Sequence, residues 1–238
     1  KTRRLGSWLA ILAASALIGW WLTYDPTPAY RYRLTVEVET PEGLRTGSSV
    51  IEVETSVASS FSIPSPGLVS HRVRGEAVAV DLPGGRTLFA LLRSENDIDW
   101  ASRVMFMLAP EAPKTASDPF QARFDNMLKL KRPIVLPRTW PPVAHLPESS
   151  AYPMLVTFDN LADPSSVEQV DPSDFAASFG EGVRLKRITV QLTDDPVTKD
   201  IVGRLPWLGR IQDMNLALED FPEGFPVGDF SGLFRKPS

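Results

Sequence analysis

The feature that most constrains this chain is a run without charge, LGSWLAILAASALIGWWLTY, which lies between Arg4 and Asp25. A helix rises about 1.5 Å per residue, so this run spans roughly 30 Å, the thickness of the hydrocarbon core of a bilayer. The sequence therefore predicts a transmembrane helix over residues 5–24. A short cytoplasmic N-terminus, residues 1–4, precedes it, and a proline-containing spacer, residues 25–29, follows it.

The residues that flank the run indicate its orientation. Basic residues remain on the cytoplasmic side of a membrane, and Trp and Tyr concentrate where lipid meets water. The residues with this role as a membrane anchor are Arg3, Arg4, Trp8, Trp20, Trp21 and Tyr24. The rest of the chain is then expected outside the cytoplasm. The alternative is a cleaved signal peptide, because Ala14-Ser15-Ala16 has the small-x-small pattern of a cleavage site.

Small residues recur every four positions in the predicted helix, at Gly6, Ala10 and Ala14. Such spacing lets two helix backbones approach closely within a membrane, so these three residues are candidates for helix–helix packing against an integral-membrane partner. The alternative is coincidence, because alanine-rich membrane segments also produce this spacing.

Charge and cysteine content indicate the compartment. Without Lys1, Arg3 and Arg4, the 25 basic residues fall to 22, against 29 acidic ones. An acidic domain argues against binding to nucleic acid or to anionic lipid, both of which favour a basic face. The chain has no cysteine and no Asn-x-Ser/Thr sequon, whereas extracellular eukaryotic domains usually carry one or the other. We therefore expect a single-pass protein of the bacterial inner membrane with its domain in the periplasm.

Alternation of apolar and polar residues predicts strands in the remaining chain. Residues 30–39 alternate strictly, and residues 49–57 are expected to return as the second strand of a hairpin. A second hairpin is predicted from residues 73–82 and 87–92, with Pro83-Gly84-Gly85 as its turn. Further strands are expected at 154–158 and 183–193, the latter with a bulge near Lys186. Residues 89–92 are apolar on both faces, which indicates a central strand.

Four Asp-Pro pairs, at Asp118, Asp163, Asp171 and Asp195, predict helix starts, because Asp accepts hydrogen bonds from free N–H groups and Pro has none to leave unpaired. Another helix is expected over residues 98–108, and the proline-rich residues 133–153 are expected to lie extended over the core. The fold class is therefore α+β, an antiparallel β-sheet domain with short helices over residues 30–219, preceded by one transmembrane helix.

The sequence contains few residue patterns that are typical of catalysis or of metal binding. The two histidines, His71 and His145, have no helical or other ligand spacing, and neither a nucleophile elbow nor a phosphate-binding loop is present. The acidic groups are explained as helix caps. We therefore expect no catalytic residues, no metal site and no cofactor. The alternatives are a membrane-tethered hydrolase, with carboxylates and one of the histidines as base, and a module that binds an envelope ligand.

The C-terminal tail, residues 220–238, carries four phenylalanines between glycine, proline and acids: Phe221, Phe225, Phe230 and Phe234. Large aromatic side chains on an extended segment are typical of partner-binding anchors. The alternative is that the tail folds back and buries these rings on its own sheet, since exposed phenylalanines are costly.

Two segments, residues 75–92 and 194–208, resemble parts of uncharacterised bacterial single-pass envelope proteins. That resemblance implies no activity, cofactor or site. With a single anchor, a short spacer and no recognisable catalytic set, the leading hypothesis is a non-catalytic accessory or assembly subunit of a bacterial inner-membrane complex.

Overall fold

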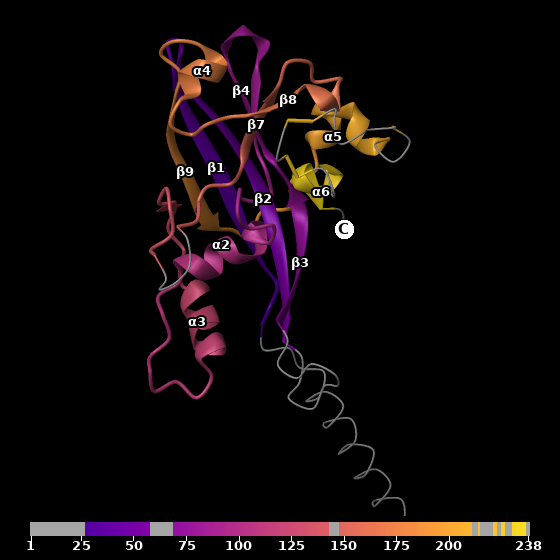
Figure 1. The fold of residues 1–238 in the computed structure, drawn as a ribbon. Coiled ribbons are helices and arrows are strands. Elements are labelled where there is room, and N and C mark those ends of the chain that lie inside the picture. The colour runs from indigo at the N-terminus through magenta and orange to yellow at the C-terminus, as the bar shows by residue number, and fades with distance from the viewer. Residues whose placement is uncertain are drawn as a thin grey trace, which may run out of the picture. The chain divides into compact units, whose positions relative to one another are not determined.

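The computed structural model describes residues 27–57, 69–142, 148–210, 214, 221–222, 225–226 and 230–236. Its contacts divide the chain into two compact units. The first comprises Lys1–Pro28 with Thr55–Ser70, and in its described part the Thr27 hydroxyl donates to the carbonyl of Thr55 (2.6 Å). The second comprises Ala29–Glu54 with His71–Ser238 and contains most of the described residues (Figure 1).

The larger of two antiparallel sheets has six strands in the order β10-β3-β2-β1-β9-β6. Its strands are β1 (Tyr30–Thr40), β2 (Gly43–Val57), β3 (Val69–Glu76), β6 (Ile134–Val135), β9 (Arg184–Leu192) and β10 (Arg235–Lys236). The predicted hairpin is confirmed, with Tyr30 opposite Val53 and Thr40 opposite Gly43. The predicted bulge is also confirmed: Arg187 opposes Glu37 while Leu185 opposes Val38, so Lys186 is the extra residue.

The smaller sheet has four strands in the order β4-β5-β7-β8. Its strands are β4 (Val78–Asp81), β5 (Thr87–Ala90), β7 (Leu155–Phe158) and β8 (Val167–Gln169). The hairpin around Pro83–Gly85 is confirmed, but the prediction of one strand over residues 73–82 is wrong. The chain passes from the large sheet to the small sheet at Ala77, whose N–H donates to the Phe234 carbonyl (2.8 Å). The alternation of apolar residues runs through this break, so the sequence pattern alone does not separate the two strands.

The small sheet is buried on both faces. Leu88 and Ala90 pack into the core shared with the large sheet, whereas Phe89 and Leu91 pack into a second core. That second core lies against α5 (Ile201–Arg204), the 3-10 turn η3 (Pro206–Gly209) and α6 (Phe230–Phe234). This arrangement is the physical reason for the two apolar faces of β5, which lies between β4 and β7 as predicted.

Two helices, α2 (Trp100–Leu108) and α3 (Pro119–Met127), lie together at the end of the large sheet where β1 begins (Figure 1). The prediction of α2 is confirmed, and Trp100 and Val104 are buried as expected. Asp118 caps α3 by accepting from the Gln121 N–H (3.0 Å). Asp163 caps the 3-10 turn η2 (Pro164–Ser166) in the same way.

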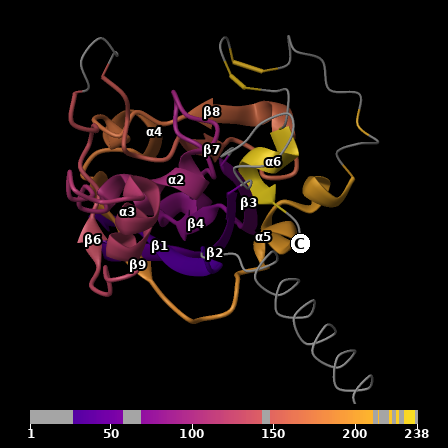
Figure 2. The same cartoon turned by 90° about the horizontal axis from the view of Figure 1, so that it is seen from below.

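Two of the Asp-Pro predictions are wrong. The helix after Asp171 begins later, as α4 (Phe175–Phe179), with Asp174 as its cap. Asp195 begins no helix, because its carboxylate accepts from Arg33 (2.5 Å) and from the Thr193 hydroxyl (2.7 Å). The chain instead crosses the outer face of the large sheet before α5, where the Thr198 N–H donates to the Val50 carbonyl (3.2 Å; Figure 2).

The proline-rich strip lies extended on the core in its described parts, residues 133–142 and 148–153. Within it, β6 pairs with β9, Thr139 bridges to Ser150, and Leu136 is buried. The interpretation of this strip as a segment laid over the core is therefore confirmed for these residues.

Candidate functional site

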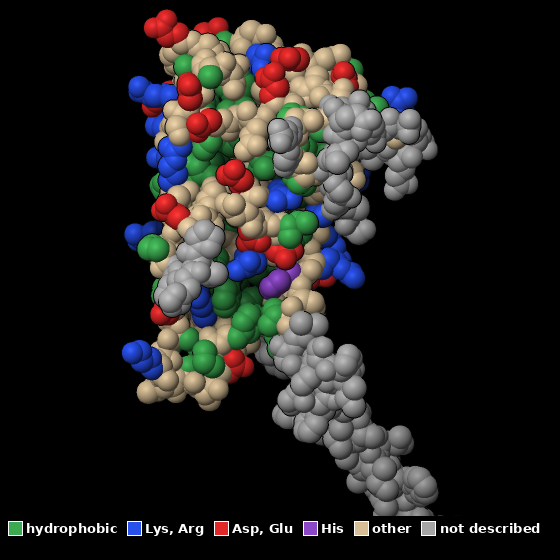
Figure 3. Space-filling model, viewed as in Figure 1, with side chains coloured by type: hydrophobic (Ala, Val, Ile, Leu, Met, Phe, Trp, Pro, Cys, Tyr) green, Lys and Arg blue, Asp and Glu red, His purple; other side chains and the backbone are tan. Residues whose placement is uncertain are grey.

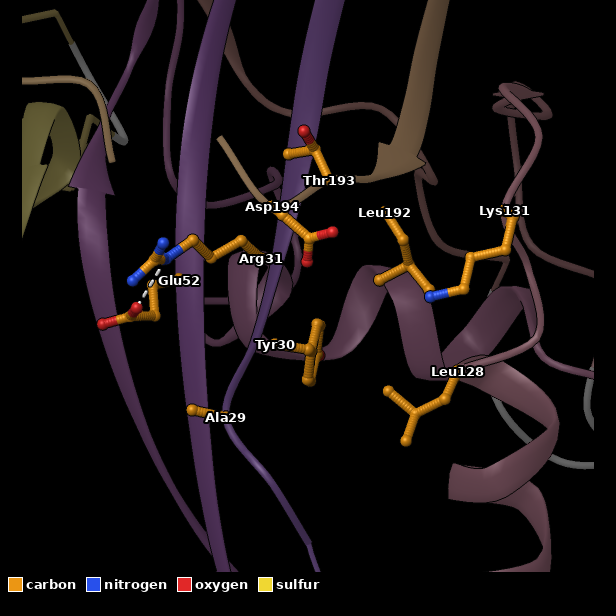
Figure 4. A pocket seen from close by; sticks show the side chains of 9 residues that line it. All are labelled: Ala29, Tyr30, Arg31, Glu52, Leu128, Lys131, Leu192, Thr193 and Asp194. Carbon is orange, nitrogen blue, oxygen red and sulfur yellow. Dashed lines mark hydrogen bonds and ion pairs between the residues drawn. The ribbon is translucent and has the colours of Figure 1, made fainter. Parts of the chain in front are cut away.

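Two hollows open at the end of the unit where β1 begins. The first, named here the β1 hollow, has a volume of about 440 Å³ (Figure 4). It is lined by Ala29, Tyr30, Arg31, Glu52, Leu128, Lys131, Leu192, Thr193 and Asp194. It forms because β9 ends at Leu192 while β1 extends further, to Tyr30, and the chain then turns away after the Thr193 N–H has donated to the Arg31 carbonyl (3.0 Å).

The charges in the β1 hollow fall into two groups. Arg31 donates to Glu52 (2.7 Å), and Arg74 donates to the other oxygen of Glu52 (2.9 Å). The hydrogen bond from Arg31, together with that from Arg74, holds the pKa of the Glu52 carboxyl below its usual range. Lys131 and Asp194 differ, because neither side chain has an ion pair or hydrogen bond to any other residue that the structure describes.

Two tyrosines fix the start of β1 to α2. The buried hydroxyl of Tyr30 donates to the Ser102 carbonyl (3.2 Å), and that of Tyr32 donates to the Ala101 carbonyl (2.7 Å). Burial raises the pKa of both phenols, so both remain neutral donors. The ring of Tyr30 also meets Phe124 of α3 edge-on, at 5.9 Å between centroids. The first residue of β1 is therefore held by both helices.

The second hollow, named here the His71 hollow, has a volume of about 370 Å³. It is lined by His71, Arg72, Val73, Leu92, Ile98, Asp99, Ala101, Ser102 and Lys236. Figure 3 shows acidic, basic and apolar side chains gathered around the histidine on this face. The hydrolase alternative requires a histidine beside a carboxylate in a concave site, and His71 and Asp99 do share this hollow.

The neighbouring hydroxyl is not arranged as a nucleophile. Ser102 is buried, and its Oγ donates to the backbone carbonyl of Asp99 (2.7 Å). Burial is the main cause that lowers the pKa of His71; Arg103 lowers it further and Asp99 opposes them. A depressed pKa suits a neutral base, but no substrate-facing nucleophile accompanies it among the described lining residues.

The depressed pKa of His71 predicts a pH dependence of stability. Between the folded pKa and the usual value near 6.5, the unfolded chain binds more protons than the folded one. The stability linked to His71 is therefore complete above about pH 6.5 and is lost as the pH falls through the folded pKa. We expect His71→Gln to lose less stability than wild type between pH 7 and pH 5, measured by urea unfolding. The difference should be below tenfold in the unfolding constant, because the ring is partly exposed. If the free energies of unfolding of the wild type and of His71→Gln changed equally with pH, this prediction would be wrong.

The predicted site residues have different outcomes. The anchor residues Arg3, Arg4, Trp8, Trp20, Trp21 and Tyr24, the packing residues Gly6, Ala10 and Ala14, and His145 lie outside the described residues. Those interpretations stay predictions. Among the described residues, none of the helices combines the length and the hydropathy that crossing a membrane requires. The described part of the chain also contains no cluster of three or more His, Asp and Glu able to hold a metal ion.

The four phenylalanines of the aromatic tail are buried in the unit's own second core. Phe221, Phe225, Phe230 and Phe234 are each at most 7% exposed. Phe230 stacks on Trp207 at 5.2 Å, and Phe221 stacks on Phe225 at 6.1 Å. This is the folded-back alternative, and in this arrangement the rings are not available as exposed anchors. A role in partner binding would require the tail to leave the core.

Local sequence patterns do not reveal that Lys131 and Asp194 share the β1 hollow. The acid pair Asp194-Asp195 is explained by those patterns as a helix cap, and Lys131 lies near the predicted end of the helix that starts after Asp118. The proximity of the two residues depends on where β9 stops relative to α3, which no local pattern records. The one available signal is Asp194-Asp195 after a strand without a following apolar helical stripe.

The chain was compared with protein-family models, with curated proteins and with solved structures. None of the three comparisons returns a match.

Proposed function

We propose that this chain is a non-catalytic accessory or assembly subunit of a bacterial inner-membrane complex, anchored by one helix with its β-rich domain in the periplasm. The observation that carries the proposal is the fixation of Tyr30 by α2 and α3. The described β1 strand starts there, and only the spacer, residues 25–29, separates it from the uncharged run that ends at Tyr24.

The spacer sets how far such a domain can reach. Five extended residues, 25–29, span at most about 18 Å. Because Tyr30 is held in the core, the spacer gains no further length from β1. A short tether suits a domain that is held against a membrane-embedded partner. It does not suit one that searches the envelope for distant substrates.

The end of the unit that follows the spacer is also the end that carries both hollows. Tyr30 lines the β1 hollow, and Ser102, whose carbonyl accepts the hydrogen bond from the Tyr30 hydroxyl, lines the His71 hollow. Ile98 is 61% exposed in the His71 hollow. Both surfaces therefore lie close to Tyr30, where the described domain begins, and they are the candidates for contact with a partner.

The test is extraction of the tagged full chain from its native membrane in mild detergent, followed by measurement of its native mass and subunit stoichiometry. We expect recovery in a larger complex at a fixed ratio. Replacing Gly6, Ala10 and Ala14 together with leucine should release the chain, because the added side chains prevent close helix contact. Ala16→Leu, on another face of the predicted helix, is the matched control and should stay bound.

A second variant addresses the tether. Insertion of about 12 Gly/Ser residues after Pro28 should weaken assembly, because the effective concentration of the domain at its partner falls as the linker lengthens. Recovery of the wild-type chain alone, as a monomer or homodimer, would contradict the proposal and would direct attention to the His71 hollow as a site for a reaction or ligand.

A further inference from the structure

The β1 hollow places opposite charges on facing walls. Figure 4 shows the Asp194 carboxylate entering from the turn after β9 and the Lys131 side chain entering from the opposite side. They are not paired with each other, since no N···O distance between them falls within 4.0 Å. The nearby charges are already satisfied: Arg31 and Glu52 pair with each other, and the next acid, Asp195, pairs with Arg33.

From this arrangement we propose that the β1 hollow binds a small zwitterion, with its ammonium group at Asp194 and its phosphate or carboxylate group at Lys131. A ligand with only one charge would leave the other wall charge unmatched. A ligand with both charges forms a charge-assisted contact at each end. The hollow is neutral overall, and so is a ligand whose anionic group carries a single charge, which limits the desolvation cost on binding.

Most of the lining is polar, but part of it is apolar and can contact the carbon chain of a ligand. Leu128, Leu192 and Tyr30 also line the hollow, and Figure 4 shows Leu192 beside the end of the Lys131 side chain, with the Tyr30 ring and Leu128 lower in the view. They provide contact for a short carbon backbone and no partner for further polar groups. A volume of about 440 Å³ is within the range of small-molecule sites. The ligand class is therefore a small primary amine joined by a short carbon chain to an anionic group.

This chemistry has two sources at a membrane surface. One is a soluble phosphorylated amino alcohol or amino acid, and the other is the headgroup of a zwitterionic phospholipid with a primary amine. Ala29 lines the hollow and is the last residue of the spacer that begins at Asp25, the first residue past the uncharged run. The lipid source depends on the proposed membrane anchor, whereas the soluble source does not.

The soluble arm titrates O-phosphoethanolamine into the full chain in a maltoside detergent, with heat release as the readout. We expect saturable binding by the wild type, and a weakening of tenfold or more in Asp194→Asn and in Lys131→Gln. The matched controls are Glu181→Gln and Lys114→Gln, exposed charges away from the hollow, which should bind as the wild type does.

The lipid arm places the full chain in nanodiscs of phosphatidylethanolamine or of phosphatidylglycerol and counts the lipids retained on release into a mass spectrometer. Selective retention of the amine lipid, lost in the same two variants, would support the headgroup source. Combining Asp194→Lys with Lys131→Asp should restore binding in whichever arm responds, because a zwitterion can reverse its direction. A purely structural role of the two side chains would not produce that rescue.

The outcomes are separable. Binding in the soluble arm alone supports a free ligand, and retention in the lipid arm alone supports the headgroup. No binding in either arm, or binding unchanged in both single variants, overturns the proposal. Neither readout requires a protein partner, so failure here leaves the accessory-subunit proposal standing, and failure of assembly leaves the ligand site standing.

Discussion

Replacing Phe234 with alanine is expected to lower the free energy of unfolding by about 4 kcal/mol. The side chain is fully buried and lies at the centre of the second core. Its ring meets Phe89 (6.0 Å), Phe158 (5.7 Å), Trp207 (5.6 Å) and Phe230 (5.4 Å) between centroids. Removing it leaves a cavity bordered by rigid rings, which cannot collapse to fill the space.

The backbone around Phe234 also connects the two sheets. The Ala77 N–H donates to the Phe234 carbonyl (2.8 Å), and the Leu92 N–H donates to the Leu233 carbonyl (2.9 Å). The next two residues, Arg235 and Lys236, pair with β3 of the large sheet. Removal of residues 220–238 is therefore expected to unfold the unit. Loss of assembly after that truncation would not identify the tail as a docking segment.

Pulse proteolysis of the full chain in urea measures the effect of Phe234→Ala, because cleavage reports the unfolded fraction in detergent as well as in water. Leu44→Ala is the control: Leu44 is 51% exposed, and its loss should change the unfolding free energy by less than about 0.5 kcal/mol. A cost for Phe234→Ala below about 1 kcal/mol would show that the second core does not stabilise the unit.

Gly47→Ala is expected to destabilise the unit by about 3 kcal/mol, although it adds a single methyl group. Gly47 lies on β2 opposite Val36, facing β4 of the small sheet. A Cβ built there would lie 2.1 Å from the Ala79 carbonyl oxygen and 2.8 Å from its carbonyl carbon. Both contacts are with backbone, so relief requires the two sheets to separate locally.

The same urea assay tests this prediction, with Gly203→Ala as the matched control. Gly203 lies in α5, and a Cβ there would have no neighbour within 4 Å. Alanine at a helical position should be neutral or stabilising by up to about 1 kcal/mol. If Gly47→Ala matched Gly203→Ala in stability, the close packing of β2 on β4 would be refuted.

Local sequence patterns are sufficient to predict much of the large sheet. The alternation from Tyr30 to Glu39 identifies a strand with one buried face, and the phase change near Lys186 identifies the bulge in its neighbour. The Asp-Pro pattern at Asp118 predicts a helix cap, and the structure confirms it. Each of these outcomes depends on side chains within a few residues of one another, so the physical cause is visible in the sequence itself.

Outcomes that depend on distant contacts are not predictable from local patterns. Asp195 carries the same Asp-Pro pattern as Asp118, but its carboxylate pairs with Arg33 and caps no helix. The strand predicted through Ala77 breaks because the Ala77 N–H pairs with the carbonyl of Phe234, near the far end of the chain. The β1 hollow exists because β9 stops at Leu192 while β1 continues.

By itself the sequence determined the α+β class, the first hairpin and the two-faced burial of β5, since periodicity and turn chemistry are local properties. It also carries the uncharged run on which the proposed anchor depends. Tertiary structure alone decided which strands share a sheet, where the four phenylalanines of the tail are buried, and that Lys131 and Asp194 line one hollow. These depend on long-range backbone pairing and packing, whose energies involve residues that no local pattern relates.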